Sequence, residues 1–475
     1  MHSVNQTTDA MVRSILAYAE NRLRMTPVPL DRGTRSAQEL SFELDGLIRD
    51  NPRPPDEVLG VYSSVIAPSI ISADSPRFLG FIPAAPTKAS LLFDMVVSSA
   101  SIQGISWLEA SGAIAAENSA LRVIADEAGM PAGAGGCFVS GGSAGNLSAL
   151  AVARETGKHR LGDALAGRRP RVVVGEDAHS SIVNTLRLLE MDALVVRTPD
   201  HRLTGPTVRA AIAADPDPSD VVAVVATSGT TNAGIVDDLA GVGAIAREHD
   251  WWFHVDGAYG GSGIFAHSLK PKYAGLELAD SFILDPHKWL FAPFDCCALL
   301  YRQPAPRPRH PGRVLPWTSS TPTTRPASGT RTDYAYHLTR GGPGWKPLWF
   351  SLAVHGIDAY RSAIEVAVDL ARQTAELIAA TPHLELIREP DCARVVLFRR
   401  VAGTRPTTTS GPPPCTATAS RAIPPSKWRA RRSAGSPSCT RTPDGTGPAD
   451  PRPHRLTAPP LPARINSARR STSRM

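Results

Sequence analysis

Residues 252–261 read Trp-Phe-His-Val-Asp-Gly-Ala-Tyr-Gly-Gly, an apolar run that closes on an acid and then enters a glycine-rich turn. A run of five residues bounded by a turn signal has the length of a buried strand rather than of a helix. Similar runs occur on both sides of it, at 137–140, 171–175, 193–197, 221–227, 281–285 and 297–302. Amphipathic stretches lie between several of them, at 144–157, 180–190 and 238–249. This alternation predicts an α/β domain with a mostly parallel central sheet and helices on both faces.

The segments outside this α/β part follow other patterns. Apolar residues at helical spacing predict helices within 9–50, two more within 88–130 and a long helical region at 345–380. Short apolar runs at 384–387 and 395–398 then begin a small α+β unit that stops after Val401. Because that unit is incomplete, we expect its strand edges to be uncovered. The chain is thus predicted to comprise an N-terminal helical segment, a large α/β domain, a Pro/Arg-rich loop, the start of a small domain and a Pro/Arg-rich tail, at 1–75, 76–302, 303–331, 332–401 and 402–475.

The net charge of +7 is unevenly distributed. Residues 303–331 hold five Arg, seven Pro and no acid, and residues 402–475 hold thirteen Lys or Arg, two acids and fourteen Pro. The rest of the chain is therefore acidic. Because the Arg of the tail are dispersed among Pro, Thr and Ser, and only Trp428 could stack on a base, we expect no nucleic-acid partner. We interpret the tail as disordered or as the product of a shifted reading frame, a hypothesis that also fits 303–331 and that sequencing the coding DNA would test.

Targeting and cysteine patterns favour a cytoplasmic protein. The sequence has no run of about 18 apolar residues, so we expect no transmembrane helix and no membrane partner. The N-terminus lacks a charged region followed by an apolar stretch, which a secretion signal requires. The six Cys show neither C-x-x-C spacing nor a zinc-like grouping, so we expect free thiols and no metal site.

Polar residues follow four of the predicted strands, at the edge of the sheet where catalytic groups gather. The turn Ser-Gly-Gly-Ser-Ala-Gly-Asn at 140–146 can form an anion-binding nest at a helix start, although a plain connection explains it equally well. It lacks the Gly-Lys-Ser/Thr of a nucleotide triphosphate loop. His179 follows the predicted strand at 171–175, the Thr-Ser-Gly-Thr-Thr turn at 227–231 follows the one at 221–227, and either can be structural.

Asp256 closes the strand quoted first, and Lys288 lies in Asp-Pro-His-Lys-Trp at 285–289. A buried acid needs a cationic or donor partner, so the two residues could form a structural ion pair. Together with the anion nest, however, they are the three groups that pyridoxal phosphate requires. The lysine forms a Schiff base, the carboxylate keeps the pyridine nitrogen protonated, and the nest holds the phosphate.

With these motifs the chain resembles the group II pyridoxal-phosphate decarboxylases, which include aromatic-L-amino-acid, glutamate and histidine decarboxylases. The resemblance runs from about residue 75 to 401, except 303–331. It includes three further motifs, which are Gly-Ile-Ser-Trp at 104–107, Asp-Ser-Phe at 280–282 and Phe-Asp-Cys at 294–296. It implies a fold-type I homodimer and a lyase of amino-acid metabolism that converts an L-amino acid to the amine and carbon dioxide.

The resemblance also implies roles for individual residues. Lys288 would form the Schiff base, Asp256 would pair with the pyridine nitrogen, and His179 would stack on the cofactor ring and orient the substrate carboxylate. The other cofactor-binding residues would be Ser143, Ala144, Thr231, Ala258, Asp285 and His287. Of these, Asp285 stands where many relatives have Asn beside the phosphate.

Substrate choice and activity are less determined. The residues implied for the substrate pocket, Phe81, Pro83, Ile105 and Trp107, are apolar, which favours an aromatic substrate over glutamate. Relatives carry a mobile loop whose tyrosine protonates Cα, and this chain has 303–331 there, without a tyrosine. An inactive cofactor-binding remnant therefore stays an alternative, as does another lyase or an aminotransferase of the same fold.

Overall fold

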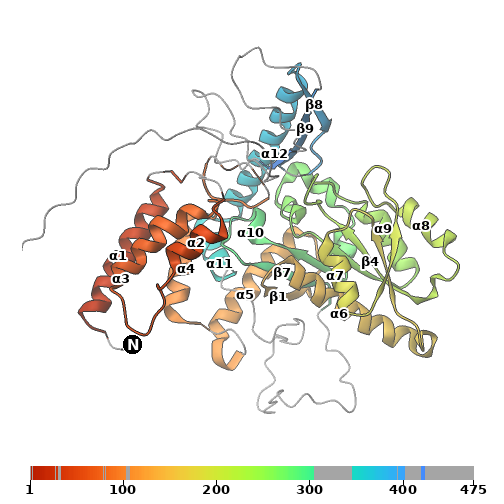
Figure 1. Ribbon diagram of the computed structural model, residues 1–475. Coiled ribbons are helices and arrows are strands. Elements are labelled where there is room, and N and C mark those ends of the chain that lie inside the picture. The colour runs from red at the N-terminus through yellow and green to blue at the C-terminus, as the bar shows by residue number, and fades with distance from the viewer. Residues whose placement is uncertain are drawn as a thin grey trace, which may run out of the picture. The chain divides into compact units, whose positions relative to one another are not determined.

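A computed structural model describes residues 2–303, 345–401 and 419–422, except residues 3, 27, 30–33, 77, 79, 81, 103–106 and 393. The loop predicted at 303–331 lies outside the described residues apart from Gln303, and so does the tail apart from Ala419–Ala422. The helices are α1 (Gln6–Arg24), α2 (Ala37–Leu44), α3 (Pro55–Val61), α4 (Lys88–Ala100), α5 (Trp107–Glu127), α6 (Gly142–Leu161), α7 (Ser180–Leu188), α8 (Gly205–Ala214), α9 (Leu239–Glu248), α10 (Pro286–Trp289), α11 (Trp345–His355) and α12 (Ile357–Ala379) (Figure 1).

Seven strands form the central sheet in the order β1-β7-β6-β5-β4-β2-β3. They are β1 (Gly135–Val139), β2 (Arg171–Gly175), β3 (Asp192–Val196), β4 (Val221–Thr227), β5 (Trp252–Asp256), β6 (Ser281–Leu284) and β7 (Cys297–Tyr301). The pairs among β2 to β6 are parallel, and β7 runs antiparallel to both of its neighbours. The predicted mostly parallel sheet is confirmed, and each predicted strand lies within a few residues of its observed position.

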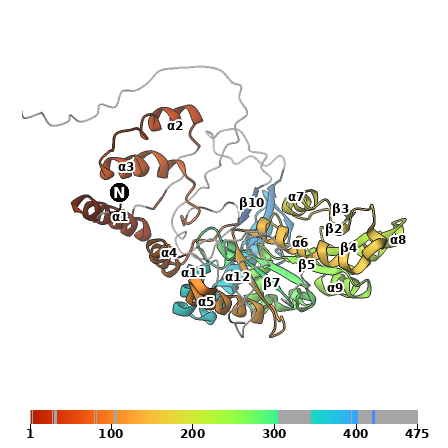
Figure 2. The ribbon, with the colours of Figure 1, turned by 90° about the horizontal axis from the view of Figure 1, so that it is seen from below.

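The two faces of the sheet carry separate apolar cores because side chains alternate along each strand. On one face, Val173, Phe253 and Phe282 pack in a core with residues of α5, α9 and α12. On the other face, Val172 and Val225 pack with residues of α6 and α7. Figure 2 shows α6 and α7 on one side of the strands and α9 on the other. Helices thus cover both faces, as the sequence predicts.

Several helical regions differ from the prediction, and α3 and α10 also lie outside the predicted helices. Helix α8 is not among the predicted elements, because only Val208 and Ile212 give it an apolar spacing; Thr204 caps its first turn. The region predicted as one long helix at 345–380 is divided into α11 and α12 at Gly356, whose φ of 74° lies in the left-handed region that glycine favours. The predicted helices before residue 130 are observed as α1, α2, α4 and α5. Among the described residues, every helix is too short or too polar to span a bilayer.

A second, antiparallel sheet follows α12. It contains β8 (Leu384–Arg388), β9 (Val395–Arg400) and β10 (Ala419–Ala422), in the order β10-β9-β8. The edge of β9 that we expect to be uncovered is therefore paired, because a short segment of the tail forms a strand beside it. The side chains of β8 and β9 pack on α12 through a small core of its own, which contains Ala371, Ala375 and Val396.

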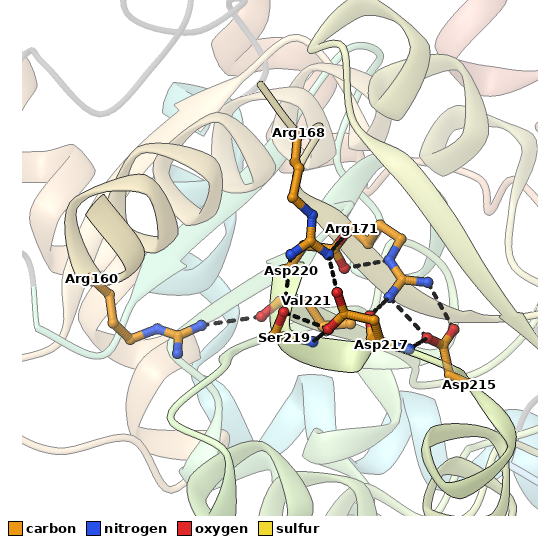
Figure 3. A network of polar contacts seen from close by, with 8 residues as sticks. All are labelled: Arg160, Arg168, Arg171, Asp215, Asp217, Ser219, Asp220 and Val221. Carbon is orange, nitrogen blue, oxygen red and sulfur yellow. Dashed lines mark hydrogen bonds and ion pairs between the residues drawn. The ribbon is translucent and has the colours of Figure 1, made fainter. Parts of the chain in front are cut away.

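The amino ends of β2 and β4 are joined by charged side chains (Figure 3). Arg171 donates to both carboxylate oxygens of Asp215, at 2.7 and 3.0 Å, and also contacts Asp220. Arg168 pairs with Asp217 and with Asp220, at 2.9 and 2.7 Å. Hydrogen bonding to Asp215 raises the pKa of Arg171, and the Arg171 guanidinium holds the pKa of the Asp215 carboxyl below its usual range. These contacts fix the turn that leads into β4, at the end of the sheet opposite the candidate site.

Candidate active site

The carboxyl ends of the parallel strands open into a cavity of about 1190 Å³. All nine residues that the sequence singles out as catalytic or cofactor-binding line it, namely Ser143, Ala144, His179, Thr231, Asp256, Ala258, Asp285, His287 and Lys288. Of the four residues implied for the substrate pocket, Phe81 and Ile105 lie outside the described residues, as does the side chain of Trp107. Pro83 is described and half-buried, and it does not line this cavity.

The anion nest predicted at 140–146 lies at the N-terminus of α6. Here the chain passes very close to two neighbouring loops, because a Cβ on Gly142 would lie 2.9 Å from the Cβ of Ala258 and 3.1 Å from Oδ2 of Asp285. The backbone N–H of Gly142 donates to that same oxygen at 3.3 Å. A helix N-terminus with unpaired amides attracts anions, and in this chain a carboxylate of its own, that of Asp285, lies at the nest.

Lys288 lies on the one-turn helix α10, three residues after Asp285. Its Nζ lies 2.9 Å from Oδ2 of Asp285, which is itself almost completely buried. Burial lowers the pKa of the Lys288 amine, but the carboxylate of Asp285, helped by that of Asp256, leaves the pKa above its ordinary value. The other oxygen of Asp285, Oδ1, is buried without a hydrogen-bond partner among the described residues. The cavity therefore contains a charged amine and an incompletely satisfied carboxylate.

Asp256 ends β5, between β4 and β6, with an exposed fraction of only 4%. Its Oδ1 accepts from the backbone N–H of Ala258 at 3.1 Å, and its Oδ2 accepts from Nδ2 of Asn146 at 3.0 Å. Each carboxyl oxygen of Asp256 therefore accepts a hydrogen bond from an amide N–H. These two contacts fix the orientation of the Asp256 side chain in the cavity wall.

Two histidines contribute to the cavity from neighbouring elements. His179 is the N-cap of α7, and its Nδ1 lies 2.9 Å from the Oγ of Ser181. The ring of His287 lies against the ring of Phe294, with 4.3 Å between the centroids, and its Nδ1 lies 2.8 Å from the carbonyl oxygen of Cys296. Burial lowers the pKa of His287 despite the proximity of Asp285. Helix α7 follows β2 and α10 follows β6 at the carboxyl edge of the same sheet, and both rings line the one cavity there.

The second sheet also contributes to the cavity, which sequence analysis does not reveal. Ile387, Arg388 and Leu397 line it. Between these strands, Asp391 binds Arg202 at 2.7 Å and accepts from the backbone N–H of Val236 at 3.0 Å. These contacts join residues more than 150 positions apart, and no short motif announces them.

The buried guanidinium of Arg394 reaches the lysine itself. Its Nη2 donates to the carbonyl oxygen of Lys288 at 3.0 Å and also contacts the carbonyl oxygen of Ile82. It lies over the ring of Trp289 at 5.8 Å from the centroid. The start of β9 therefore holds the backbone of the lysine turn in place.

The donor set fits pyridoxal phosphate. A nest of backbone amides at Gly142 suits the phosphate, Lys288 supplies an amine, and Asp256 supplies a buried carboxylate for a protonated ring nitrogen. The cavity is large enough for the cofactor together with an amino acid. Among the described residues, no three metal-ligating side chains gather into a group that could hold a metal ion.

Comparison with known proteins also points to pyridoxal phosphate as the cofactor. The family model described as "Pyridoxal-dependent decarboxylase conserved domain" matches residues 39–400. The chain is 28% identical over 386 residues to an aromatic-L-amino-acid decarboxylase of Bacillus atrophaeus, covering 80% of this chain and 78% of that protein. It is 27% identical to a 4-hydroxyphenylacetaldehyde synthase of Rhodiola rosea, covering 70% of this chain and 69% of that protein.

Among solved structures, one of Oryza sativa TDC with PLP and tryptamine is similar with a TM-score of 0.74. Its sequence is 23% identical, and the match covers 85% of each chain. At that identity the likeness supports the fold, which is the fold-type I architecture predicted from the sequence.

Proposed function

The chain belongs to the pyridoxal-dependent decarboxylases, which are carboxy-lyases that use pyridoxal phosphate, and from this membership we propose that it decarboxylates an aromatic L-amino acid to the corresponding amine and carbon dioxide. The observation that carries the proposal is the convergence of Lys288, Asp256 and the amide nest of α6 in one cavity. Three separated motifs meet there, each with the chemistry that one part of the cofactor needs.

In this proposal the chain holds the cofactor at three points. The nest at Gly142, with Ser143, Ala144 and His287 beside it, binds the phosphate, and the Nζ of Lys288 binds the aldehyde carbon covalently. Asp256 keeps the ring nitrogen protonated by placing a negative charge next to it. When bound, pyridoxal phosphate supplies an electron sink for the pair left behind when the bond between Cα and the carboxylate breaks.

The remaining residues handle the substrate and a proton. His179 lies in the cavity wall where its ring can stack on the cofactor and its free nitrogen can bind the substrate carboxylate. Once the substrate amine has replaced Lys288 on the aldehyde carbon, the released Nζ would lie beside Asp285, whose carboxylate raises the pKa of the amine, and it would be a source of the proton that Cα must receive after carbon dioxide leaves. Such a role matters in this chain because 303–331 contains no tyrosine to supply that proton.

The aromatic preference is supported by the names of the relatives and by the apolar lining that Phe294 and Leu397 add to the cavity. A panel of L-amino acids, incubated with the protein and pyridoxal phosphate, tests it through released carbon dioxide. We expect the largest release from an aromatic amino acid. Release from glutamate alone would contradict the preference while leaving the decarboxylase proposal standing.

Replacing Lys288 with Ala tests the proposal most directly. The variant should lose the visible absorbance of the lysine-bound cofactor and all measurable carbon dioxide release. Lys270→Ala, which removes a half-exposed lysine paired with Glu127, is the matched control and should keep both. An unchanged cofactor spectrum in Lys288→Ala would contradict the assignment of the lysine.

A second candidate reaction follows from the missing tyrosine. If Cα is protonated too slowly after carbon dioxide has left, the product can be lost as an aldehyde, either by hydrolysis with the amino group kept on the cofactor or by oxidation with dioxygen, which releases ammonia and hydrogen peroxide. A keto acid would form only if the carboxylate is kept and the Cα–H bond breaks instead, as in an aminotransferase. The relative from Rhodiola rosea is named as an aldehyde synthase. Assaying amine, aldehyde and keto acid in the same incubation separates these reactions, and cofactor binding without any product would favour the inactive remnant.

Assembly and location belong to the same proposal. We propose a cytoplasmic homodimer with the five parts predicted from the sequence. In α1, Val12, Ile15 and Leu16 are half-exposed apolar side chains, which suits a helix that packs on a second subunit. The cysteines of the described residues are free and buried, as a reducing compartment would keep them. Sedimentation equilibrium of the full chain tests the dimer, and a monomer at micromolar concentration would contradict it.

A further inference from the structure

We propose that Asn146 is a positioning residue that orients two cofactor-facing groups at once, the carboxylate of Asp256 and the imidazole of His179. The inference deepens the proposed function and rests on it, because it concerns how the same cavity is prepared for the cofactor. The inference rests on a series of hydrogen bonds that links Trp252 to His179, which we call the hydrogen-bond chain. Each donor and each acceptor in the hydrogen-bond chain can be assigned.

The chain of hydrogen bonds begins at the first residues of β5 and β6, away from the cavity lining. The indole Nε1 of Trp252 lies 2.8 Å from the Oγ of Ser281. An indole N–H can only donate, so Ser281 must accept this hydrogen bond. The hydroxyl proton of Ser281 is then available for its other neighbour, the Nδ1 of His254, which lies 2.8 Å away.

The next member of the hydrogen-bond chain is His254, and the question is which of its ring nitrogens carries the proton. Its side chain is completely buried, and burial lowers its pKa to about 4 even though Asp256 favours the charged form. The ring is therefore neutral near pH 7 and carries a single proton. The Nδ2 of Asn146 donates to Asp256, so the Oδ1 of the same amide faces His254. The proton of the ring therefore resides on Nε2, which donates to that Oδ1 at 2.8 Å, and Nδ1 accepts from Ser281.

The amide of Asn146 consequently has only one possible orientation. With Oδ1 facing His254, its Nδ2 lies 3.0 Å from Oδ2 of Asp256 and 2.9 Å from the Oγ of Ser181. Both amide protons are used. A flipped amide would place an oxygen against the carboxylate and an N–H against the N–H of His254, so two hydrogen bonds would become repulsive contacts.

The two branches end on the two groups that face the cofactor. On one branch, the Oδ2 of Asp256 accepts a hydrogen bond from the Nδ2 of Asn146 at 3.0 Å. On the other, Ser181 accepts from Asn146, so its hydroxyl proton points to the Nδ1 of His179 at 2.9 Å, and its backbone N–H donates to that nitrogen at 3.2 Å. With Nδ1 accepting, neutral His179 carries its proton on Nε2, the nitrogen left to bind the substrate carboxylate.

All members of the hydrogen-bond chain except Trp252 and His179 are buried, so they are shielded from water. Asn146 and Ser281 have exposed fractions of 1% and 0%. Water therefore cannot replace a lost partner, and a wrong protonation at one member is transmitted to the next. Asn146 is the branch point, so replacing it should change both His179 and Asp256, whereas a purely structural asparagine would change neither.

The test measures the histidine tautomer directly, without cofactor or substrate. Full-length protein labelled with ¹⁵N-histidine is examined by NMR, and the His179 resonances are assigned by their loss in His179→Gln. In the native chain we expect His179 as the Nε2–H tautomer. In Asn146→Asp, which cannot donate to Ser181, we expect a mixture of both tautomers. Ser148→Ala, a buried change two residues along the same helix, is the control and should keep the native signals.

A second readout covers the Asp256 branch. The ring nitrogen of ¹⁵N-labelled pyridoxal phosphate bound to Asn146→Ala should shift toward the unprotonated value, and the cofactor should bind roughly tenfold more weakly, as the loss of one hydrogen bond to a charged group implies. Unchanged His179 tautomer and unchanged ring-nitrogen shift in both Asn146 variants would overturn the inference. Because the tautomer is measured on cofactor-free protein, this result is independent of whether the protein decarboxylates amino acids.

Discussion

The two ends of the seven-stranded sheet both carry polar networks, but the networks are built in opposite ways. At the amino ends of β2 and β4, Arg171 and Arg168 meet three aspartates in direct ion pairs (Figure 3). At the carboxyl ends, neutral side chains are connected by one-way hydrogen bonds that finish on Asp256 and His179. At the amino end each charged side chain forms an ion pair with another side chain of the protein.

The difference separates stability from function. Paired charges near the surface hold a turn and need nothing further, so their removal costs folding free energy alone. At the carboxyl end, Asp256 receives its hydrogen bonds from an amide side chain and a backbone amide, and among the described residues no cation donates to it. Its charge is left for a ligand. Substitutions at the two ends should therefore affect different measurements.

The largest effect is expected for Asp256→Asn. The variant removes the negative charge that keeps the ring nitrogen protonated, and we expect turnover of the cofactor-saturated protein to fall about 10³-fold, as for the loss of other preorganised electrostatic groups. Carbon dioxide release measures it. Asp215→Asn is the control from the amino end and should change turnover less than twofold while lowering stability. Turnover in Asp256→Asn above a tenth of the native value would break the comparison.

The sequence predicts the carboxyl ends of the strands better than it predicts the amino ends. The strands, the glycine-rich turn and Asp256 are predictable because apolar runs and turn residues are local signals. Asn146 ends the turn at 140–146, and Ser181 lies two residues after His179. His254 lies two residues before Asp256, hence on the same face of β5. That shared face was the available signal for the hydrogen-bond chain.

Other contacts could not be predicted. The partners Arg202 and Asp391, or Arg394 and the carbonyl of Lys288, are joined only by the tertiary fold. No spacing rule connects residues so far apart along the chain. The amino-end network is similar, since Arg171, Asp215 and Asp220 read as ordinary surface charges until β2 and β4 are known to be neighbours.

The second prediction concerns pH and the buried His254. Its pKa in the folded protein is about 4, against 6.5 for an ordinary histidine. Between these values the unfolded chain binds a proton that the folded protein does not, so the free energy of unfolding should decrease as the pH falls from 6.5 to 4. At about 1.4 kcal/mol per pH unit the loss amounts to roughly 3 kcal/mol.

Urea unfolding at a series of pH values measures this loss. In His254→Gln the corresponding part of the slope should vanish, whereas the exposed His355→Gln should keep the native slope. The network at the amino end contains no histidine, so changes in it should leave the slope between pH 6.5 and 4 attributable to His254 unaltered. Equal slopes in the native protein and His254→Gln would show that the carboxyl-end chain is not a source of acid sensitivity.

The third prediction concerns the amino end. Arg171→Met leaves Asp215 without its cation and Asp220 with Arg168 alone, and both aspartates are nearly buried. We expect a loss of about 2 kcal/mol in the free energy of unfolding, between the values for exposed and buried ion pairs. Cofactor affinity should stay within twofold. Arg169→Met, which removes a half-exposed arginine from a 3.4 Å pair with Asp192, is the control and should cost less than about 0.5 kcal/mol. A tenfold loss of cofactor affinity in Arg171→Met would contradict the separation of the two ends.

The smallest effect, and the sharpest, is expected for Asp285→Asn. Asp285 contacts both the amide nest at Gly142 and the amine of Lys288, so in the cofactor-free chain its carboxylate lies where a phosphate is to be held. Two negative groups repel, and the isosteric amide should therefore bind pyridoxal phosphate about tenfold more tightly. Pyridoxal, which has no phosphate, should gain less, because only the effect on Lys288 remains. The ratio of the affinities for pyridoxal phosphate and pyridoxal therefore separates the effect of Asp285 on the amide nest from its effect on the amine of Lys288.

Asp177→Asn provides the control for this ratio, since Asp177 lines the same cavity but is bonded to Thr198 and His201 rather than to the nest. An equal gain for both ligands in Asp285→Asn would mean that the carboxylate acts on Lys288 alone. Weaker binding of pyridoxal phosphate would mean that the carboxylate serves the phosphate through a shared proton. We therefore expect a gain in affinity that is larger for pyridoxal phosphate than for pyridoxal. Such a gain fits charges at the carboxyl end that lack a full set of partners until a ligand binds, in contrast to the paired charges around Arg171.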